Sequence, residues 1–122
     1  MADKEFWERC GFYQSKRAYH YECGKRVPNW LCPDGSRVFR AYRFEGYLPS
    51  SDLDTLFRYA VPKFADGGVQ FVYEYDCCRC YVYTWGHLEI VTSPNNTGNI
   101  ADSYALSAQA LRQAIEQVME AE

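Results

Sequence analysis

The stretch SSDLDTLFRYAVPKF at residues 50–64 decides the class of fold, because the strand-like stretch VQFVYEYD follows it closely at residues 69–76. The first stretch spaces its apolar side chains as one face of a helix does: Leu53, Leu56, Phe57, Ala60, Val61 and Phe64. This spacing predicts an amphipathic helix with Phe57 in the core and an N-cap within Ser50–Asp52. Pro62 should kink the helix or end it early, since proline lacks an N–H and clashes with the preceding turn.

Residues 69–76 and 80–84 alternate as the two arms of a β-hairpin that should turn near Cys77–Arg79. In the first arm Phe71 and Tyr73 share one face, and we expect this face to cover the helix and both side chains to join the core. The second arm places three aromatic residues on one face: Tyr81, Tyr83 and Trp85. The register of the turn decides which side they take, and on the side away from the helices they would form a surface patch suited to anchor a partner.

The C-terminal third continues with a strand and a helix. Residues 87–92 (HLEIVT) predict a further strand, or a bulged extension of the preceding arm, and residues 93–99 predict an exposed loop. Asp102-Ser103 should cap the last helix. One face of that helix carries its apolar residues: Tyr104, Ala108, Leu111, Ile115 and Val118.

The N-terminal part predicts a short helix over Lys4–Cys10, capped by Asp3, and then three strands: Arg17–Cys23, Val27–Cys32 and Val38–Phe44. Turns at Gly24–Arg26 and Pro33–Gly35 separate the strands, the second because proline presets φ and glycine accepts a positive φ. The whole pattern predicts an α+β fold, with a mostly antiparallel sheet of about five strands packed with two main helices and a short N-terminal helix. We expect a single domain over residues 1–122.

The composition indicates a chain that can bury a hydrophobic core without disulfide bonds or structural metal ions. It has 122 residues, 48% of them hydrophobic, and no run of about 18 apolar residues that would predict a membrane span. The charged stretch Met1–Arg9 does not resemble a signal peptide. We therefore expect a cytoplasmic protein without membrane partners, in which most of the six cysteines are reduced.

Charge divides the chain into two unlike parts. Residues 1–43 carry nine Lys or Arg against five Asp or Glu, whereas residues 44–122 carry four against eleven. Such polarity steers partners and can drive head-to-tail association, so a homodimer is compatible with it. Tyrosine occurs eleven times, and this residue suits surfaces that bind, although it also lines the faces of half-exposed sheets.

The cysteine-rich turn is the best candidate for a metal site, though a weak one. Its residues are Cys77, Cys78 and Cys80, with His87 nearby. Zinc sites usually present their ligands as C-x₂-C, whereas here the spacing is C-C-x-C and the first cysteine faces away from the other two. We therefore favour small buried thiols and expect no metal or other cofactor. Because no thiol lies in a recognisable histidine context, we also expect a protein that is not an enzyme.

Basic and aromatic residues alternate near the N-terminus. The basic set is Lys16, Arg17, Lys25, Arg26, Arg37, Arg40 and Arg43, and the aromatic set is Tyr13, Tyr19, Tyr21, Trp30, Phe39 and Tyr42. This mixture suits stacking on bases and neutralising phosphates, but the pI of about 5.4 is far below that of a dedicated nucleic-acid domain. We favour a solvated or protein-binding face. The partner-binding residues predicted from the sequence are Tyr81, Tyr83, Trp85, Arg37, Arg40 and Arg43.

Four short motifs occur in an order that resembles the phage ABA-sandwich domain family of small phage and prophage proteins. They are a helix that closes on Cys10-Gly11, Trp30 shortly before Pro33-Asp34-Gly35, the stretch YLPSSD at residues 47–52, and Ala101-Asp102-Ser103 before an alanine-rich helix. The long tyrosine-rich segment between the first two motifs departs from the usual pattern. The resemblance implies an α/β sandwich and a phage or prophage origin, and it implies no particular activity.

Together these features favour a small phage- or prophage-encoded binding protein over an enzyme. The first hypothesis is stoichiometric binding to a host protein, in the manner of a counter-defence inhibitor such as an anti-CRISPR. The second hypothesis is a sponge for a nucleotide signal, in which arginines would meet the phosphates and an aromatic ring would stack on the base. The third is a zinc-stabilised nucleic-acid-binding module, in which bound metal would supply folding energy.

Overall fold

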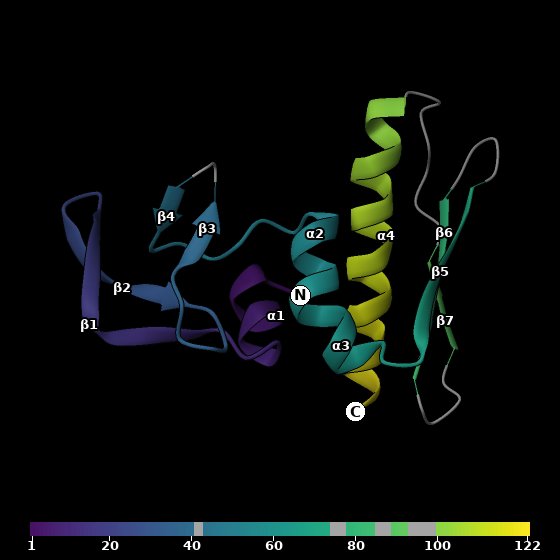
Figure 1. Cartoon of the computed structure of the whole chain (residues 1–122), viewed down its shortest axis with the longest axis horizontal. Helices are drawn as coiled ribbons and strands as arrows, with labels where there is room; N and C mark the ends of the chain where they lie inside the picture. Colours follow the sequence, from purple (N-terminus) through teal and green to yellow (C-terminus); the bar gives the residue numbers. More distant parts are fainter. Residues whose placement is uncertain (41–42, 74–77, 85–88, 93–99) are drawn as a thin grey trace. The chain divides into compact units, whose positions relative to one another are not determined.

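The computed structural model describes residues 1–40, 43–73, 78–84, 89–92 and 100–122 (Figure 1). The internal contacts of the chain divide it into two compact units, Met1–Ser50 and Ser51–Glu122. This division leaves the single domain over residues 1–122 as a prediction, because two compact units can belong to one domain. None of the described helices has a long enough apolar run to cross a membrane.

The first unit opens with helix α1 (Asp3–Arg9), which is held by aromatic packing. Phe6 and Trp7 are fully buried, and the Trp7 ring makes edge-on contacts with Phe6 at 4.9 Å and with Phe12 at 5.2 Å between centroids. Such packing is needed because a helix of two turns is unstable by itself. Asp3 does not cap the helix as predicted but lies in its first turn, where its charge still complements the helix dipole.

Strands β1 (Tyr13–Glu22) and β2 (Lys25–Leu31) form a two-stranded antiparallel sheet, here named the β1–β2 ribbon. Its two-residue turn consists of Cys23 and Gly24, which both have positive φ, at 50° and 77°. Two-residue turns with this conformation match the twist of the flanking strands. The turn therefore begins one residue earlier than the sequence predicted, and β2 starts at Lys25.

The β1–β2 ribbon contains a bulge that the sequence did not predict. Gln14 pairs with Trp30 and Tyr19 pairs with Pro28, so residues 15–18 of β1 lie opposite a single residue of β2. The Ser15 hydroxyl oxygen holds the bulge by accepting the backbone N–H groups of the residues two and three positions ahead, at 3.1 and 3.0 Å. The extra residues fix which side chains share a face beyond this point.

The predicted third strand, Val38–Phe44, is wrong in its extent, because two short strands occupy this region. Strand β3 (Val38–Arg40) pairs with β4 (Arg43–Glu45), and Phe39 lies opposite Phe44 in the register. Strand-like composition alone does not distinguish one strand from two short ones joined by two residues. The turn at Pro33–Gly35 is confirmed, since the Gly35 N–H donates to the Cys32 carbonyl at 2.9 Å and Gly35 has a φ of 88°.

The second unit begins with the predicted helix, which runs without a break through α2 (Leu53–Thr55), the π-helical turn η1 (Leu56–Ala60) and α3 (Val61–Phe64). Asp52 is confirmed as its cap, because the Asp52 carboxylate accepts the Thr55 N–H at 2.8 Å. Pro62 does not end the helix early. The π turn precedes the proline and adds one residue to the turn, which accommodates a residue that cannot donate an N–H.

The π turn also changes which side chains are buried. Leu56, Ala60 and Phe64 recur every four residues and are at most 5% exposed. Phe57, predicted to lie in the core, is instead 43% exposed. The sequence prediction assumed a regular α-helix, and the wider turn rotates this residue out of the buried stripe.

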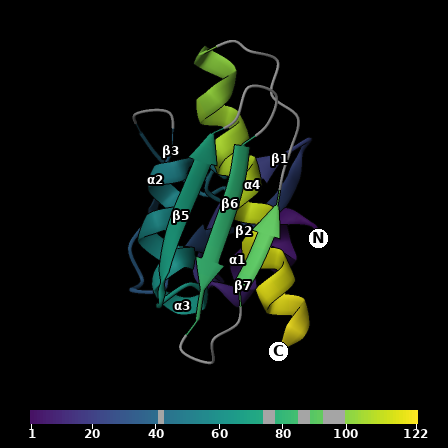
Figure 2. The same ribbon diagram turned by 90° about the vertical axis from the view of Figure 1, so that its right-hand side faces the viewer.

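Three strands and a long helix complete the second unit. Strands β5 (Gly68–Tyr73), β6 (Cys78–Tyr83) and β7 (Glu89–Thr92) form an antiparallel sheet in that order, and α4 (Ile100–Ala121) packs on one face of it, mainly over β6 and β7 (Figures 1 and 2). The predicted turn near Cys77–Arg79 is wrong for its last two residues, which already belong to β6. The further strand predicted over residues 87–92 is confirmed over Glu89–Thr92, and residues 87–88 and 93–99 lie outside the described part.

Helix α4 buries most of the face that the sequence predicted. Ala108, Leu111, Ile115 and Val118 are at most 7% exposed, while the side chain of Tyr104 lies outside the described part. The helix begins at Ile100, so Asp102-Ser103 lies within its first turn and does not cap it as predicted. The spacing of the apolar residues indicated the buried face correctly, because that face depends on the helical repeat and not on which residue begins the helix.

The α+β class and the antiparallel pairing of strands are confirmed, as are the two main helices and the short N-terminal one. The prediction of one sheet with about five strands is wrong. The described strands form three separate antiparallel sheets of two, two and three strands. Within each sheet, strands that are consecutive in sequence pair with one another, and the helical segment Leu53–Phe64 separates the last sheet from the first two along the chain.

Candidate functional site

The side of the sheet that packs against α4 is marked by a hydrogen bond between Tyr73 and Ser107. Their hydroxyl oxygens lie 2.7 Å apart, and Ser107 is buried. Val69, Phe71 and Tyr73 of β5 pair in register with the fully buried side chains of β6: Val82, Cys80 and Cys78. Paired residues in an antiparallel sheet share a face, so all six belong to the face that α4 covers.

The prediction that Phe71 and Tyr73 face the helices is therefore confirmed, but their assignment to the core is wrong. Tyr73 is 57% exposed and Phe71 is half-buried. Strand β5 is at the edge of the sheet, and α4 packs mainly over the other two strands. Phe71 instead lies beside the exposed ring of Phe57, with 6.3 Å between centroids.

The opposite side of this sheet, here named the outer sheet face, carries five side chains: Gln70, Val72, Arg79, Tyr81 and Tyr83. Tyr81 and Tyr83 are both half-buried, and the Tyr83 hydroxyl donates to the Gln70 side-chain oxygen at 3.4 Å. Figure 2 shows the sheet in front of α4, and no described helix or strand of residues 51–122 lies over this face. The register thus places both tyrosines away from the helices, while Trp85 lies outside the described part.

The predicted arginines belong to the other compact unit. Arg37 is exposed and forms an isolated antiparallel bridge with Leu31, whereas Arg40 and Arg43 pair with each other at the ends of β3 and β4. The side chains of Arg40 and Arg43 lie outside the described part. Of the six partner-binding residues predicted from the sequence, the three arginines therefore belong to the first unit, and Tyr81 and Tyr83 belong to the second.

The cysteines of β6 are ordinary buried thiols. Cys78 and Cys80 are fully buried on the side of α4, and the Cys78 sulfur lies 3.8 Å from the Ser107 hydroxyl oxygen. Burial, with a smaller contribution from the neighbouring Cys78, raises the pKa of Cys80 to about 12. At neutral pH a thiol with this pKa is almost entirely protonated, which makes it a poor nucleophile.

No group of three metal-ligating side chains gathers among the residues that the structure describes. Cys77 and His87, which complete the predicted weak metal set, lie outside that part of the chain.

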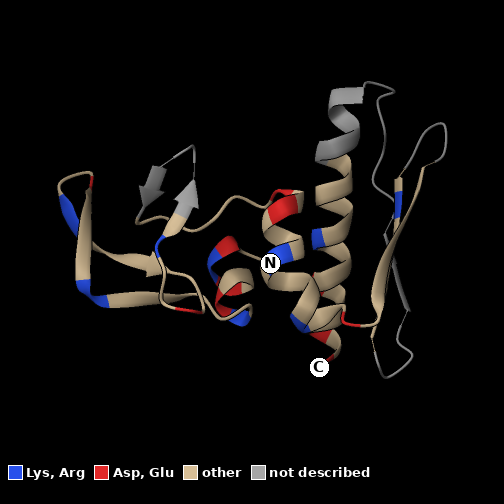
Figure 3. Ribbon diagram, in the orientation of Figure 1, with Lys and Arg blue, Asp and Glu red and all other residues tan. Residues whose placement is uncertain are grey.

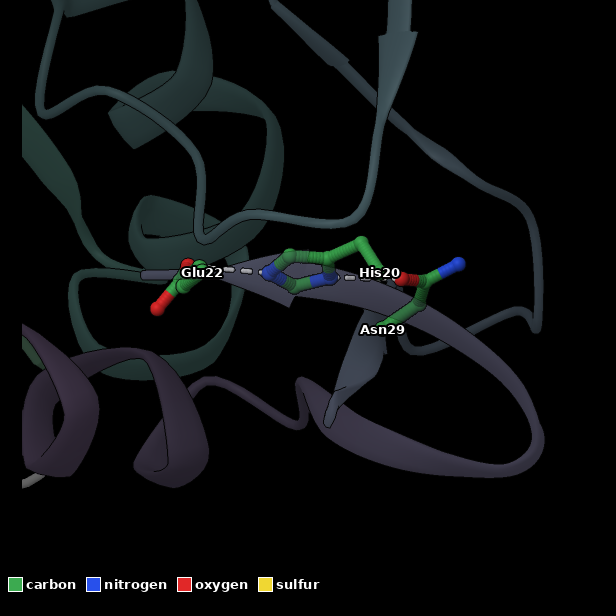
Figure 4. A network of polar contacts seen from close by, with 3 residues as sticks. All are labelled: His20, Glu22 and Asn29. Carbon is green, nitrogen blue, oxygen red and sulfur yellow. Dashed lines mark hydrogen bonds and ion pairs between the residues drawn. The ribbon is translucent and has the colours of Figure 1, made fainter. Parts of the chain in front are cut away.

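A polar cluster that was not predicted from the sequence lies on the β1–β2 ribbon. The His20 Nδ1 atom lies 2.7 Å from the side-chain oxygen of Asn29, and its Nε2 atom lies 2.9 Å from a carboxylate oxygen of Glu22 (Figure 4). The hydrogen bond to Glu22, followed by the one to Asn29, raises the pKa of His20 above its usual value. Since both partners offer oxygen acceptors, the doubly protonated ring satisfies both.

The surroundings of this cluster indicate a structural clip. The Tyr47 ring packs on His20 with 4.6 Å between centroids. A Cβ at Gly46 would overlap the Asn29 side-chain oxygen and approach His20 Nδ1 to 2.6 Å. Only glycine therefore fits at this position. Both ring nitrogens of His20 are engaged by residues of the ribbon, which suits a role in holding its two strands together.

Part of this cluster could have been predicted from the sequence. His20 and Glu22 stand two residues apart in an evident strand and must share a face. Their third partner, Asn29, is set by the bulge register, which no local pattern reveals.

The other face of the β1–β2 ribbon presents exposed aromatic and basic side chains. Tyr19 and Tyr21 are 40% and 73% exposed, and the Arg26 guanidinium lies 3.7 Å from the centroid of the Tyr19 ring. Tyr21 pairs directly with Arg26 in the register, so all three share one side. We name this set, Tyr19, Tyr21 and Arg26, the ribbon face. All three belong to the basic and aromatic segment found in the sequence, although none was selected there.

Comparison with models of protein families, with curated proteins and with solved structures finds no match to this chain. Two surfaces are candidate binding sites by the chemistry of their described residues, the outer sheet face and the ribbon face.

Proposed function

We propose that this chain is a non-enzymatic protein that acts by stoichiometric binding to a protein partner, with the outer sheet face as its docking surface. The observation that carries the proposal is the register of β5 with β6. It turns Tyr81 and Tyr83 away from α4, while the opposite face of the same strand supplies fully buried side chains. When only one side of a sheet is covered, its second side is available to solvent or to a partner.

The composition of the outer sheet face suits a protein partner. Tyrosine and arginine are enriched among the residues that dominate binding energy at protein interfaces, and this face combines two tyrosines with Arg79. Tyr81 and Tyr83 stand two positions apart on a central strand, which presents them on a fixed backbone. A rigid aromatic pair loses little conformational entropy on binding. Trp85, two positions further, remains a prediction from the sequence as a third member.

The resemblance to small phage and prophage proteins supports a phage or prophage origin for this chain. On that basis we propose a phage- or prophage-encoded inhibitor in the cytoplasm of a bacterial host, and a component of the host defence as its target. The acidic second unit, with ten Asp or Glu against four Lys or Arg in residues 51–122, favours a basic partner surface. Nucleic-acid-binding defence proteins commonly present such surfaces, because they must neutralise phosphates.

The test is an immunity assay in bacteria that carry an active defence system. Expression of the chain should restore plating of a targeted phage, and Tyr81→Ala with Tyr83→Ala should abolish the effect while leaving expression unchanged. The matched control is Tyr73→Ala, because this tyrosine belongs to the same sheet but to its opposite face. Unchanged immunity across defence systems, with no defence component recovered by affinity capture from the host, would overturn the proposal.

A further inference from the structure

The β1–β2 ribbon carries an excess of positive charge that its own residues do not compensate. Four basic residues lie on it: Lys16, Arg17, Lys25 and Arg26. None of them forms an ion pair with a residue whose side chain is described, and all four are exposed. The one acidic residue of the ribbon, Glu22, is engaged by His20 (Figure 3 and Figure 4). This surface is therefore suited to an anionic ligand.

The same ribbon offers flat aromatic surface beside the charge. Tyr21 is the most exposed large hydrophobic side chain among the described residues, at 73%. The Arg26 guanidinium covers one side of the Tyr19 ring at 3.7 Å, which holds a cation next to an aromatic plane. Alternating cations and aromatic rings are the features by which proteins hold the backbone and the bases of single-stranded nucleic acid.

We propose that the ribbon face binds single-stranded nucleic acid. Tyr19 and Tyr21 are the stacking residues, Arg26 contacts a phosphate beside them, and Lys16 and Arg17 at the bulge extend the positive track. This site belongs to the first unit and the outer sheet face to the second, and the proposal does not depend on the function proposed for that face.

The spacing of the two tyrosines favours a single strand over a duplex. Alternate residues of a β-strand stand about 7 Å apart, at about 3.4 Å per residue. Bases in a duplex are stacked at about 3.4 Å along each strand, so they leave no room for rings at twice that interval. A single strand can open its bases to this spacing and receive a ring on each.

The experiment is fluorescence anisotropy with a labelled 15-nucleotide oligothymidine, its RNA equivalent and a DNA duplex of the same length, at 50 mM salt and at 200 mM salt. We expect the single strands to bind more tightly than the duplex. Tyr21→Ala should weaken binding by about fivefold or more, the range found when a stacking residue is removed. Lys16→Ala and Arg17→Ala should each lower the salt slope by about 0.7, the value expected for one lost phosphate contact on a single strand.

Matched control variants show whether the ribbon face itself holds the nucleic acid. Tyr21→Phe keeps the ring and should bind as the unaltered chain does. Lys4→Ala removes an exposed cation from α1 and should leave the affinity unchanged, as should the double variant Tyr81→Ala with Tyr83→Ala on the outer sheet face. Circular dichroism of each variant confirms the fold, and an exposed residue such as Tyr21 can be replaced without loss of core packing.

Three outcomes would overturn the proposal. The first is no binding of either single strand at 50 mM salt. The second is equal binding of single strands and duplex that is insensitive to Tyr21→Ala, which would indicate a generic polyanion effect. The third is competition by polyglutamate as effective as competition by an oligonucleotide of equal charge, which would indicate an acidic protein as the ligand.

Discussion

The hydroxyl groups of Tyr73 on β5 and Ser107 on α4 lie 2.7 Å apart, and this contact ties the edge strand of the sheet to the long helix. It belongs to the face that also buries Cys78 and Cys80, so it marks the covered side of the sheet. The residues of β5 and β6 whose side chains lie on the other side of the sheet, including Tyr81 and Tyr83, therefore belong to the outer sheet face. The orientation of the proposed binding residues thus depends on the pairing of two strands.

Loss of the Tyr73 hydroxyl tests this contact. Tyr73→Phe should lower the free energy of unfolding by about 0.5–1.5 kcal/mol, because it removes one hydrogen bond to a buried hydroxyl group. Tyr83→Phe is the control on the other face, where the bond to Gln70 is long and exposed, and it should change stability by less than about 0.5 kcal/mol. Urea denaturation of both variants measures the difference, and equal losses would argue against the assigned faces.

The π turn before Pro62 predicts different costs for two neighbouring residues. Leu56 is fully buried, so Leu56→Ala should cost about 2–5 kcal/mol as a core cavity. Phe57 is 43% exposed, and Phe57→Ala should cost only about 1 kcal/mol. The comparison uses thermal or chemical unfolding of the two single variants. A larger cost at the phenylalanine would mean that the helix is regular through this turn.

The raised pKa of His20 makes the stability of the β1–β2 ribbon depend on pH. A folded-state pKa above the ordinary value of about 6.5 stabilises the folded chain fully below that pH, and the contribution is lost as the pH rises through the folded-state pKa. An NMR titration of a His87→Gln variant, which leaves one histidine, should therefore give a midpoint above about 6.5.

Two further variants identify the cause of that shift. Glu22→Gln should lower the midpoint more than Asn29→Ala does, because the bond to Glu22 is the largest cause. A midpoint at or below the ordinary value in the unaltered network would show that the ring is not held between two acceptors.

Thiol reactivity should separate the cysteines by burial. In a Cys77→Ser variant, we expect iodoacetamide to modify the exposed Cys23 first at pH 8, while Cys78 and Cys80 react only after unfolding. The pKa of about 12 for Cys80 reinforces this protection, since the thiolate is the reactive form. Mass spectrometry of the peptides gives the order of modification. Rapid labelling of the β6 thiols in the folded chain would contradict their burial against α4.

Local signals in the sequence predicted much of the fold. The cap at Asp52, the turn at Pro33–Gly35 and the buried face of α4 each depend on a few neighbouring residues, and each is confirmed. The number of sheets was not predictable in this way, because strand partners are set by turns and bulges whose registers leave little trace in composition. The split of residues 38–44 into two strands is one such case.

The candidate sites show the same limit. The sequence placed Tyr81 and Tyr83 on one face of their strand, but only the pairing with β5 decides that this face points away from α4. Phe57 was misplaced because the spacing of apolar residues carries no sign of a π turn. The clip around His20 was missed because a three-residue excess in β1 brings it to Asn29.

The most direct test of the central claim is photo-crosslinking in bacterial cells that carry an active defence system. A benzophenone side chain is introduced in place of Tyr83 in one variant and in place of Tyr73 in another, at two positions on opposite faces of the same sheet. We expect the first variant to give a discrete one-to-one adduct with a defence component and the second to give none. An adduct of equal yield from the second variant, or none from the first, would contradict binding through the outer sheet face.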